Sequence, residues 1–441
     1  MNRSFNQITT KLIELENTEN LFDWKIDNIY IWEVIRYKIY GIIIEENFKD
    51  SKPIKKNIFK KIKDLLAKFL IKIQKYISAI YFNPFFDGRR SDVLIFESSR
   101  KLIFNGSYID PYTKFTYDDL IKEGYSITRY QSSYNYDKLS KRDFTIKHLD
   151  LPYLISDIKT KLLGKRISET DTIRIKDLQN VIQVQFQINF DLEKLIFQEV
   201  NLFKYNLFFF NRLLKRKNPK KIIMANFCDK TALISAARSN KIKVIDIQHG
   251  LISSDDIIYH YPHIKEESLQ YFPDQFYAWS PIWQKLCKLP LKQENIIDYG
   301  NKYLQNQKRK YSNLQKKPDQ LIVISQPGLT AKIANEFIQK CNLLAKYKIL
   351  YKLHPSEYLY AFENAQIKQI ANMKNVSFVD KHDDLYKVLA ETQYVVGVGS
   401  TVLIESISFE CKVILFEIPG VEWMHPFIDD KNVMMFDKMF L

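Results

Sequence analysis

The sequence predicts an α/β protein of two parallel-sheet domains with an added helical region at the N-terminus. Three observations support this class. The chain has 441 residues, which is too many for one hydrophobic core of ordinary size. Short apolar runs alternate with helical patterns twice, over 91–305 and over 319–441, as in parallel sheets with crossover helices. Between these regions, residues 306–318 are polar and basic, which is typical of a linker.

Residues 1–90 are expected to form the helical region. The first fifty include the stretch WKIDNIYIWEVIRYKIY, which is too apolar to be exposed. Residues 52–75 then contain nine lysines and one acid, Asp64. Over 58–80 apolar residues recur every three or four positions, which predicts a basic amphipathic helix. Such a helix either docks on an anionic membrane surface or packs on the core with its lysines in solvent.

The first α/β domain, 91–305, is expected to begin with a strand in SDVLIFESS and a second in YSITRYQ, followed by helices over about 150–215. A βαβ unit is predicted next, with strands over 222–225 and 244–247 around a helix. DQFYAW and NIIDYG predict two more strands.

The second α/β domain, 319–441, repeats this alternation. Strands are expected in QLIVISQP, KILYKLHP, VSFVD, YVVGVGS and KVILFEIP, and helices over 330–347 and 358–373.

Composition limits the partners and the compartment. The net charge of +15, from 66 basic and 51 acidic residues, favours an anionic partner, although no nucleic-acid-binding signature is evident. Four scattered cysteines without a CxxC pair predict neither a disulfide framework nor a zinc site. Without an apolar signal core or a run of eighteen apolar residues, a cytoplasmic protein is expected.

Gln248, His249 and Gly250 directly follow a buried strand of the first domain. Open α/β sheets bind ligands at the carboxyl ends of their strands. His249 is therefore a candidate base, because a histidine titrates near neutral pH. The alternative is an ordinary polar turn.

Two strand ends of the second domain carry further candidates. His354 and Pro355 end one strand, where the histidine either binds an anion or caps the structure. Gly399, Ser400 and Thr401 open a helix, and free amides at a helix start bind phosphate. The glycine is expected to let a ligand approach the backbone. Glu405, about one and a half turns further on, either reaches ribose hydroxyls or lies in solvent.

The strand ending in QHG, the His-Pro at a later strand end and the Gly-Ser-Thr helix start followed by a glutamate resemble bacterial surface-polysaccharide glycosyltransferases of the GT-B fold. The similar groups are the CMP-sialic acid and CMP-Kdo transferases and the CDP-glycerol glycerophosphotransferases, and the resemblance covers about 220–420. It implies two Rossmann-like domains facing a central cleft. It also implies transfer of a sugar or glycerol phosphate from a nucleotide-activated donor, best a cytidine nucleotide, to a capsule, lipopolysaccharide or similar surface-glycan acceptor. The acidic-acidic-glycine motif of the sialyltransferases is not evident in the first domain.

The resemblance also assigns roles to residues. His249 becomes the catalytic group, with Gln248 and Gly250 on the acceptor side. The donor site comprises His354, Pro355, Gly399, Ser400, Thr401 and Glu405. GT-B enzymes typically work without a bound divalent ion, so no metal ion and no cofactor are expected, and the Asp pairs at 255–256, 383–384 and 429–430 are expected in surface turns. A glycan or lipid-linked acceptor would place the enzyme at the inner face of the cell membrane.

Three alternatives stay open. In the first the chain is a nucleotide-sugar epimerase of the UDP-GlcNAc 2-epimerase type. In the second it is a non-enzymatic polyanion-binding protein, and in the third a catalytically silent scaffold of a polysaccharide assembly complex. An epimerase would act on a nucleotide sugar without an acceptor, and a nucleic-acid-binding protein would bind with a steep salt dependence.

Overall fold

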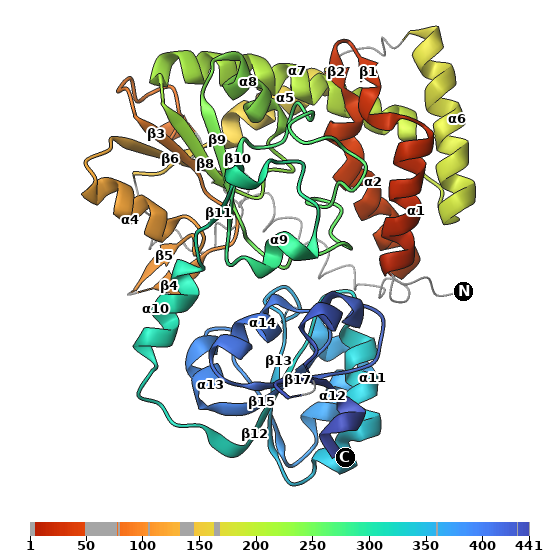
Figure 1. Cartoon of the computed structure of the whole chain (residues 1–441), viewed down its shortest axis with the longest axis vertical. Helices are drawn as coiled ribbons and strands as arrows, with labels where there is room; N and C mark the ends of the chain where they lie inside the picture. Colours follow the sequence, from red (N-terminus) through yellow and green to blue (C-terminus); the bar gives the residue numbers. More distant parts are fainter. Residues whose placement is uncertain are drawn as a thin grey trace.

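The computed structural model describes residues 5–48, 77, 80–104, 106–132, 145–162, 168–358, 360–429 and 431–440. These residues form two lobes, each built around a parallel sheet (Figure 1). Residues 52–75, with most of the amphipathic helix expected over 58–80, lie outside the described residues. The membrane-docking hypothesis for that segment therefore stays a prediction.

The N-terminal region packs on the first lobe. Helices α1 (Phe5–Thr18) and α2 (Ile31–Phe48) share one hydrophobic core with the first sheet. Between them lie a turn, η1 (Leu21–Asp23), and a hairpin of β1 (Lys25–Ile26) and β2 (Ile29–Tyr30). The hairpin interrupts the helix expected here because Asp27 and Asn28 adopt positive φ angles of 50° and 63°, as a tight two-residue turn requires.

The first sheet has seven strands in the order β11-β10-β9-β8-β3-β6-β7, all parallel. The strands are β3 (Val93–Phe96), β6 (Ile127–Gln131), β7 (Lys147–His148), β8 (Lys221–Ala225), β9 (Lys243–Ile247), β10 (Gln275–Ala278) and β11 (Ile296–Asp298). The chain starts in the middle at β3, runs to one edge, and returns to β8 beside β3. The point where the strand order reverses, between β3 and β8, is where doubly wound sheets bind ligands.

Helices cover both faces of this sheet (Figure 1). The helices of this lobe are α4 (Lys114–Lys122), α5 (Asp150–Leu162), α6 (Glu169–Phe186), α7 (Leu192–Lys217), α8 (Thr231–Ser239) and the short α9 (Ile282–Leu286) and η3 (Gln293–Asn295). Of these, α6 packs on α7 and stands next to α1, away from the sheet (Figure 1). The strands and the helical region expected from the sequence are confirmed. The small hairpin of β4 (Leu102–Phe104) and β5 (Ser107–Ile109) and the two-residue β7 were not predicted, because such short strands give no periodic pattern.

The second sheet has six parallel strands in the order β14-β13-β12-β15-β16-β17. The strands are β12 (Lys317–Ile324), β13 (Lys348–Lys352), β14 (Val376–Phe378), β15 (Thr392–Gly397), β16 (Lys412–Leu415) and β17 (Val433–Met435). Here too the order reverses, between β12 and β15. The flanking helices are α11 (Thr330–Lys340), η4 (Cys341–Leu344), η5 (Ala361–Glu363), α12 (Ala365–Ala371), α13 (Leu385–Glu391), α14 (Thr401–Ser408), η6 (Val421–Phe427) and η7 (Phe436–Phe440).

Two helices expected in this lobe are shorter than predicted. The helix expected over 330–347 leaves α geometry after Lys340 and continues as η4. The prediction of a helix over 358–373 was wrong for the first half of that range. Asn364 has an extended backbone, and its side chain accepts hydrogen bonds from the amides of Gln366 and Ile367. Because this is an N-cap, α12 begins only after it.

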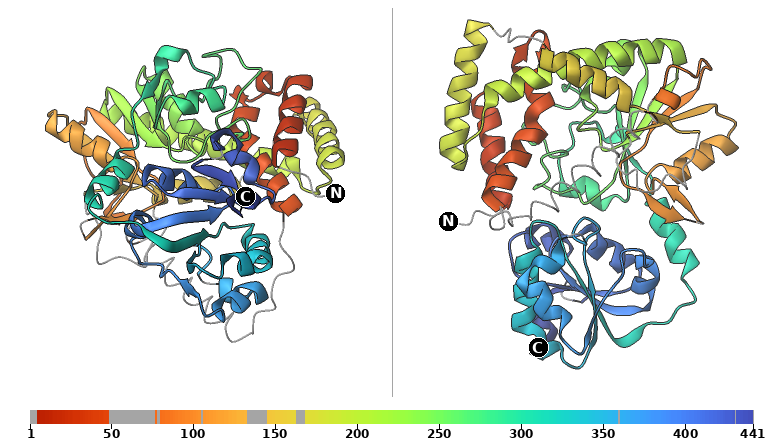
Figure 2. Two further views of the ribbon diagram at one scale, coloured as in Figure 1. Left: turned by 60° about the horizontal axis from the view of Figure 1, so that its bottom comes forward. Right: turned by 180° about the vertical axis from the view of Figure 1, so that it is seen from behind.

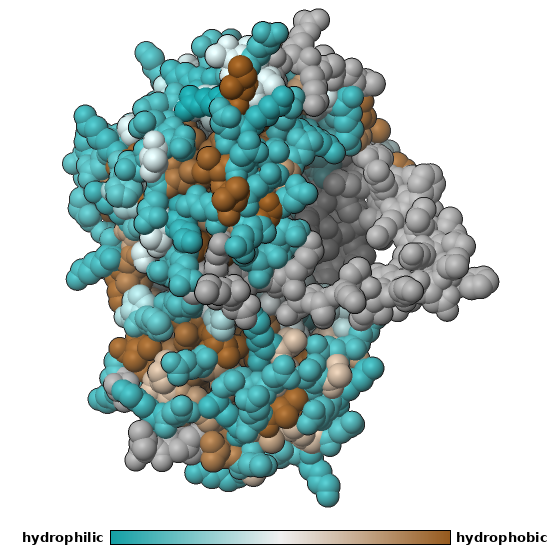
Figure 3. Space-filling view, turned by 90° about the vertical axis from the view of Figure 1, so that its right-hand side faces the viewer, coloured by the Kyte–Doolittle hydropathy of each residue, from teal (hydrophilic) through white to brown (hydrophobic). Residues whose placement is uncertain are grey.

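Helix α10 (Lys302–Lys310) and the extended chain after it lead from the first lobe to β12 (Figure 2). The expected linker, 306–318, therefore begins inside α10 and its last residues enter β12. The lobes also touch elsewhere, since the ring of Trp283 in α9 lies 5.4 Å from that of Phe427 in η6. The side of the molecule shown in Figure 3 is mostly hydrophilic, with small groups of hydrophobic side chains. In the described part of the chain no helix is long and apolar enough to cross a membrane.

Candidate functional site

The carboxyl edge of the first sheet brings together three loops that are distant in sequence. The register aligns Phe96, Met224 and Asp246 across β3, β8 and β9. The chain then continues to Arg100 after β3, to Lys230 after β8 and to His249 after β9. This is the edge, and the strand reversal, at which a ligand is expected.

His249 is partly buried and belongs to a hydrogen-bonded chain. The hydroxyl of Tyr259 donates to Asp246 Oδ2 over 2.7 Å and lies 3.2 Å from His249 Nδ1. Because that hydroxyl proton is already used, the phenol oxygen accepts from His249 Nδ1–H. The neutral imidazole then carries its lone pair on Nε2, which is the form of a proton acceptor.

Burial and charge shift the titration of this network. Burial, followed by the charges of Lys230 and Arg100, lowers the pKa of His249 to about 4. Burial raises the pKa of Asp246 to about 7, against the hydrogen bond from Tyr259 and the charge of Lys230. His249 is therefore neutral at pH 7, and Asp246 is close to half-protonated.

The two neighbours of His249 differ in what they contribute. Gln248 is fully buried, its amide donates to the Gly250 carbonyl over 2.9 Å, and its side-chain oxygen accepts from Trp279 N over 2.8 Å. Gln248 thus holds the turn, and the acceptor-side role predicted for it stays a prediction. A Cβ on Gly250 would meet no atom within 4 Å. The fold itself leaves the space beside Gly250 open.

The sequence wrongly placed Asp255 and Asp256 in a surface turn, because both side chains are buried. Asp255 accepts a hydrogen bond from Asn6 of α1 over 2.8 Å. Burial raises the pKa of Asp256 to about 7. These residues tie the loop that follows His249 to the N-terminal helix. Asp383, Asp384 and Asp429, by contrast, are exposed as expected.

Sequence reasoning missed Arg100, a solvent-exposed residue that follows the first strand of the sheet. Its Nη1 donates to the hydroxyl of Tyr112 over 2.7 Å, and the Tyr112 ring stands edge-on to His249 with centroids 6.1 Å apart. Among the described residues no carboxylate forms an ion pair with Arg100. The available signal was an arginine soon after a first strand, but its importance depends on the strand order.

The second sheet presents His354 from the corresponding edge. The register places Ile324, Lys352 and Gly397 at one level of β12, β13 and β15. His354 and Ser400 therefore lie two and three residues beyond it, on either side of the loop that follows β12. The strands are about 4.8 Å apart, so these loops are about 10 Å apart.

His354 has the opposite tautomer to His249. Its Nδ1 accepts from the backbone amide of Ser356 over 3.2 Å and lies 2.8 Å from the Ser356 hydroxyl. The ring proton is therefore on Nε2, which can donate to an anionic oxygen. Burial lowers the pKa of His354, and the charges of Arg100 and Lys352 lower it further against that of Glu357. Pro355 is exposed beside it.

Glu357, also missed, positions His354. This fully buried carboxylate accepts from the backbone amide of His354 over 2.6 Å, from the hydroxyl of Ser325 over 3.0 Å and from the hydroxyl of Thr330. It thereby joins the loops after β12 and β13 at the strand reversal.

Ser400 caps α14 as predicted. Its side chain accepts from Val402 N over 3.3 Å, and Thr401 begins the helix, partly exposed. A Cβ on Gly399 would lie 2.5 Å from the carbonyl oxygen of Gly420, and the expectation that this glycine lets a ligand approach the backbone stays a prediction. The glycine at 399 lets a neighbouring loop pack against the turn.

Glu405 is not solvated. Its side chain is 4% exposed and accepts a hydrogen bond from the Tyr386 hydroxyl over 3.0 Å. Burial raises its pKa, while Arg100 from the first lobe acts in the opposite direction. Arg100 thus lies within electrostatic reach of His249 in its own lobe and of His354 and Glu405 in the other.

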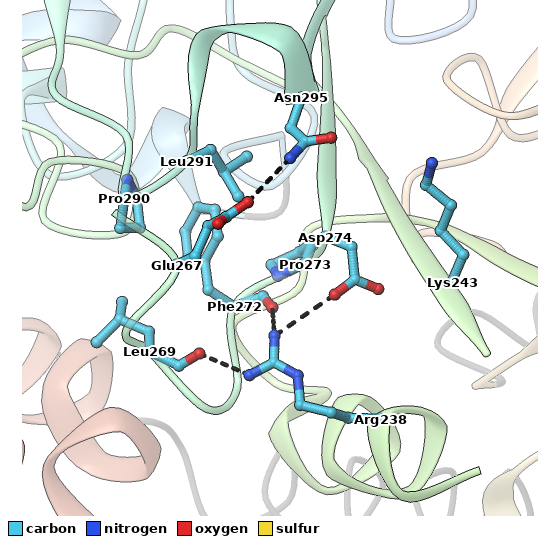
Figure 4. Close-up of a pocket in the computed structure, with 10 residues that line it drawn as sticks. All are labelled: Arg238, Lys243, Glu267, Leu269, Phe272, Pro273, Asp274, Pro290, Leu291 and Asn295. Carbon is cyan, nitrogen blue, oxygen red and sulfur yellow. Dashed lines mark hydrogen bonds and ion pairs between the residues drawn. The ribbon is translucent and has the colours of Figure 1, made fainter. Parts of the chain in front are cut away.

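A hollow of about 180 Å³ lies at the opposite, amino edge of the first sheet (Figure 4). Its polar side chains other than Lys243 already bond to neighbouring groups. Arg238 donates to the carbonyls of Leu269 and Phe272, and Asn295 donates to Glu267. This hollow is a feature of packing and contains none of the candidate residues. Within the described ranges no group of three or more His, Cys, Asp or Glu side chains is arranged to hold a metal ion.

The fold defines a class, a GT-B-like pair of Rossmann-like α/β domains with an added N-terminal helical region. No family model and no curated protein sequence matches the chain. Among solved structures it is similar to UDP-GlcNAc 2-epimerase from Methanocaldococcus jannaschii, with a TM-score of 0.46 and 9% identity over 79% of this chain and 90% of that one. The 2-epimerase from Neisseria meningitidis has a TM-score of 0.41 and 12% identity over 74% and 83% of the chains. MurG from Acinetobacter baumannii has a TM-score of 0.43 and 10% identity over 78% and 85%.

Proposed function

We propose that the chain is an enzyme acting on a nucleotide-activated sugar and that it transfers the sugar to a hydroxyl of a surface-glycan acceptor. The observation that carries this proposal is the complementary state of two histidines. His249 on one sheet edge has an unprotonated Nε2, and His354 on the other has a protonated Nε2. Transfer needs both functions, a base for the acceptor hydroxyl and a donor for the leaving phosphate.

On the acceptor side, His249 Nε2 takes the hydroxyl proton as the oxygen attacks the anomeric carbon. Tyr259 accepts the bond from Nδ1–H and holds the ring in this tautomer. The low pKa of His249 makes the free imidazole a weak base. A bound anion that offsets the charge of Arg100 raises this pKa and strengthens the base.

On the donor side, the bond from the sugar to the phosphate oxygen breaks, and negative charge grows on the departing nucleotide. His354 Nε2–H and the first amides of α14, behind Ser400, supply hydrogen bonds to that charge. Arg100 supplies a cation from the other lobe. The motif resemblance favours a cytidine nucleotide in this position.

Epimerisation of a nucleotide sugar is the second candidate. The chain of Asp246, Tyr259 and His249 favours it, because two ionisable groups of different pKa joined through a phenol can remove and return a proton without any acceptor. Product analysis with a nucleotide sugar and no acceptor separates the two activities, since only epimerisation proceeds under that condition.

Nucleotide binding tests the proposal directly. Thermal shifts with CMP, CDP, UDP and GDP are expected to show one preferred base. His354→Ala and Ser400→Ala are each expected to weaken that ligand about 10-fold or more, since the first removes a hydrogen bond to a charged group and the second removes the cap that orders the first amides of α14. His382→Ala and Ser408→Ala are matched controls, because His382 is exposed and Ser408 ends the same helix α14. Equal affinities in all four variants would exclude this donor site.

Arg100→Met tests the link between the lobes. Loss of the positive charge is expected to raise the pKa of both His249 and His354 and to weaken nucleotide binding. An NMR titration of the histidine ring protons measures the first effect and calorimetry the second. Arg89→Met, at an exposed site of the same lobe, is the control. Unchanged titration curves would show that Arg100 does not act on the histidines.

A further inference from the structure

The first lobe carries exposed apolar side chains next to basic ones on two adjacent helices. Ile155 and Ile158 of α5 are 45% and 46% exposed, and Phe208 of α7 is 61% exposed. We call this region the α5–α7 surface, defined by Ile155, Ile158, Lys159, Phe208, Arg212 and Arg216. Isolated exposed apolar residues are ordinary, but a group of them marks an interaction site.

Ring contacts fix how the two helices run beside each other. Tyr153 lies 6.4 Å from Phe210 between ring centroids, and the Lys159 ammonium lies 5.3 Å from the Tyr205 ring. The helices are therefore antiparallel, which brings the exposed isoleucines of α5 beside Phe208. Seen from behind, α5 and α7 lie together on the first lobe (Figure 2).

The chain just before β3 extends the same surface. Phe85 packs edge-on against Phe209 of α7 with centroids 5.3 Å apart. Phe86 beside it is 69% exposed, and Tyr81 is 77% exposed. Tyrosine is enriched at the membrane–water boundary, and phenylalanine is common on the apolar side of surfaces that insert there.

The charge of the surface is positive and uncompensated. Phe208, Arg212 and Arg216 follow at four-residue intervals on one face of α7. Lys159, Arg212 and Arg216 form no ion pair with any residue that the structure describes, and Lys159 and Arg212 instead lie over the rings of Tyr205 and Phe208. Each cation is thus available to an external anion.

We infer that the α5–α7 surface docks the protein on an anionic lipid bilayer. Aliphatic and aromatic side chains insert at the level of the headgroups while the cations meet lipid phosphates. A second copy of the chain is a poorer occupant, because two such faces would bring like charges together. A single-stranded nucleic acid would use the exposed rings but leave Ile155 and Ile158 in water.

This inference does not rest on the proposed transferase activity, and its test is independent of nucleotide. The full chain is mixed with vesicles of phosphatidylcholine alone or with vesicles that also contain the anionic lipid phosphatidylglycerol, which attracts basic side chains, and bound protein is sedimented. Binding is expected with the anionic vesicles and is expected to fall with added salt, because screening weakens the contribution of each cation.

Two surface variants locate the contact. Ile158→Ser/Phe208→Ser removes apolar groups, and Arg212→Glu/Arg216→Glu reverses charge, and each is expected to weaken vesicle binding about 10-fold or more. Val184→Ser, 80% exposed on α6, and Lys265→Glu, exposed in a loop, are the controls. Circular dichroism confirms that all four variants fold, which is expected because every altered side chain lies on the surface.

The results decide whether the α5–α7 surface binds an anionic bilayer. Selective loss of vesicle binding in the two surface variants supports the inference. Unchanged vesicle binding in those variants overturns it. Failure of the wild-type protein to bind either kind of vesicle also overturns it, and so does wild-type protein that prefers an RNA oligomer to lipid. Dimerisation that is abolished by Phe208→Ser, measured by light scattering, also overturns it.

Discussion

At the scale of single residues, burial shifts the pKa values of an acid and a base on the first sheet edge in opposite directions. Asp246 and His249 are both buried beside Tyr259, and burial favours the neutral form of each. This raises the pKa of the acid and lowers that of the base. At pH 7 the protein therefore keeps a neutral His249 and a half-protonated Asp246 within one hydrogen-bonded chain.

The acid gives a pH-dependent prediction for stability. The pKa of Asp246 is about 7 in the folded protein, whereas the ordinary value for this side chain is 3.8. Between these pH values the folded chain keeps a proton that the unfolded chain has released, so the carboxyl stabilises the fold at low pH and this stability is lost as the pH rises towards 7. The side chain introduced by Asp246→Asn cannot ionise. The free energy of unfolding of the variant, relative to that of the wild type, is therefore expected to increase by about 2–4 kcal/mol from pH 5 to pH 8.

Urea unfolding at the two pH values measures this difference. Asp319→Asn changes an exposed carboxylate and should follow the wild type at both. His249 contributes with the opposite sign, since its stabilising effect is lost as the pH falls from 6.5 towards 4, but that contribution is common to wild type and variant. A stability difference that is the same at pH 5 and pH 8 would contradict the raised pKa of Asp246.

The sequence identified His249 and His354 because each directly follows a strand, and strand ends are visible in a hydrophobic pattern. Arg100 and Glu357 could not be found in this way. Arg100 matters because β8 lies beside β3 and β9 lies beside β8, and Glu357 matters because it bonds to Ser325 across two loops. Both properties depend on strand order, which a single sequence does not contain.

At the scale of elements, two glycines of similar appearance have different causes. Gly399 is held against the Gly420 carbonyl, so Gly399→Ala forces backbone to move and is expected to destabilise the fold by about 1–3 kcal/mol. Gly250 faces open space, so Gly250→Ala is expected to keep its stability within about 0.5 kcal/mol. If an acceptor occupies that space, Gly250→Ala raises the acceptor KM and leaves the donor KM unchanged.

Chemical unfolding and steady-state kinetics of the two variants form a matched comparison. Equal destabilisation of both would show that the turn after β9 is as tightly packed as the turn after β15. An unaltered acceptor KM in a stable Gly250→Ala variant would remove the acceptor from the space beside His249.

Helices and strands with strong periodicity were predictable, and interruptions by side-chain caps were not. The apolar spacing of 358–373 suits one helix, yet the Asn364 side chain bonds to two amides and begins a new helix there. The N-terminal hairpin was not predicted for a similar reason, since Asp27 and Asn28 form a turn inside a region that was expected to be helical. In both cases the turn and capping preferences of Asn and Asp interrupted the predicted helix.

At the scale of the whole molecule, the two sheets are joined by contacts on the side opposite α10 as well as by α10 itself (Figure 1). Phe5 of α1 lies against Gly420, which in turn packs on Gly399. Asn6 holds Asp255 in the loop after His249. The N-terminal helix therefore contacts loops from both candidate half-sites, and the relative position of the lobes should influence the donor and acceptor sides together.

The contact between Trp283 and Phe427 allows this coupling to be measured. Phe427→Ala removes a ring packed across the lobes, 5.4 Å from Trp283, and is expected to let the lobes unfold separately, with two calorimetric transitions in place of one. The tryptophan environment reports the same event, because Trp283 loses its neighbour and should become more accessible to quenchers. Phe362→Ala is the control, since that ring packs on Phe378 within the second lobe and its loss should lower one joint transition without splitting it. If Phe427→Ala also unfolds in one joint transition, the lobes are coupled through α1 and its contacts to Asp255 and Gly420, and the ring pair contributes only to local packing.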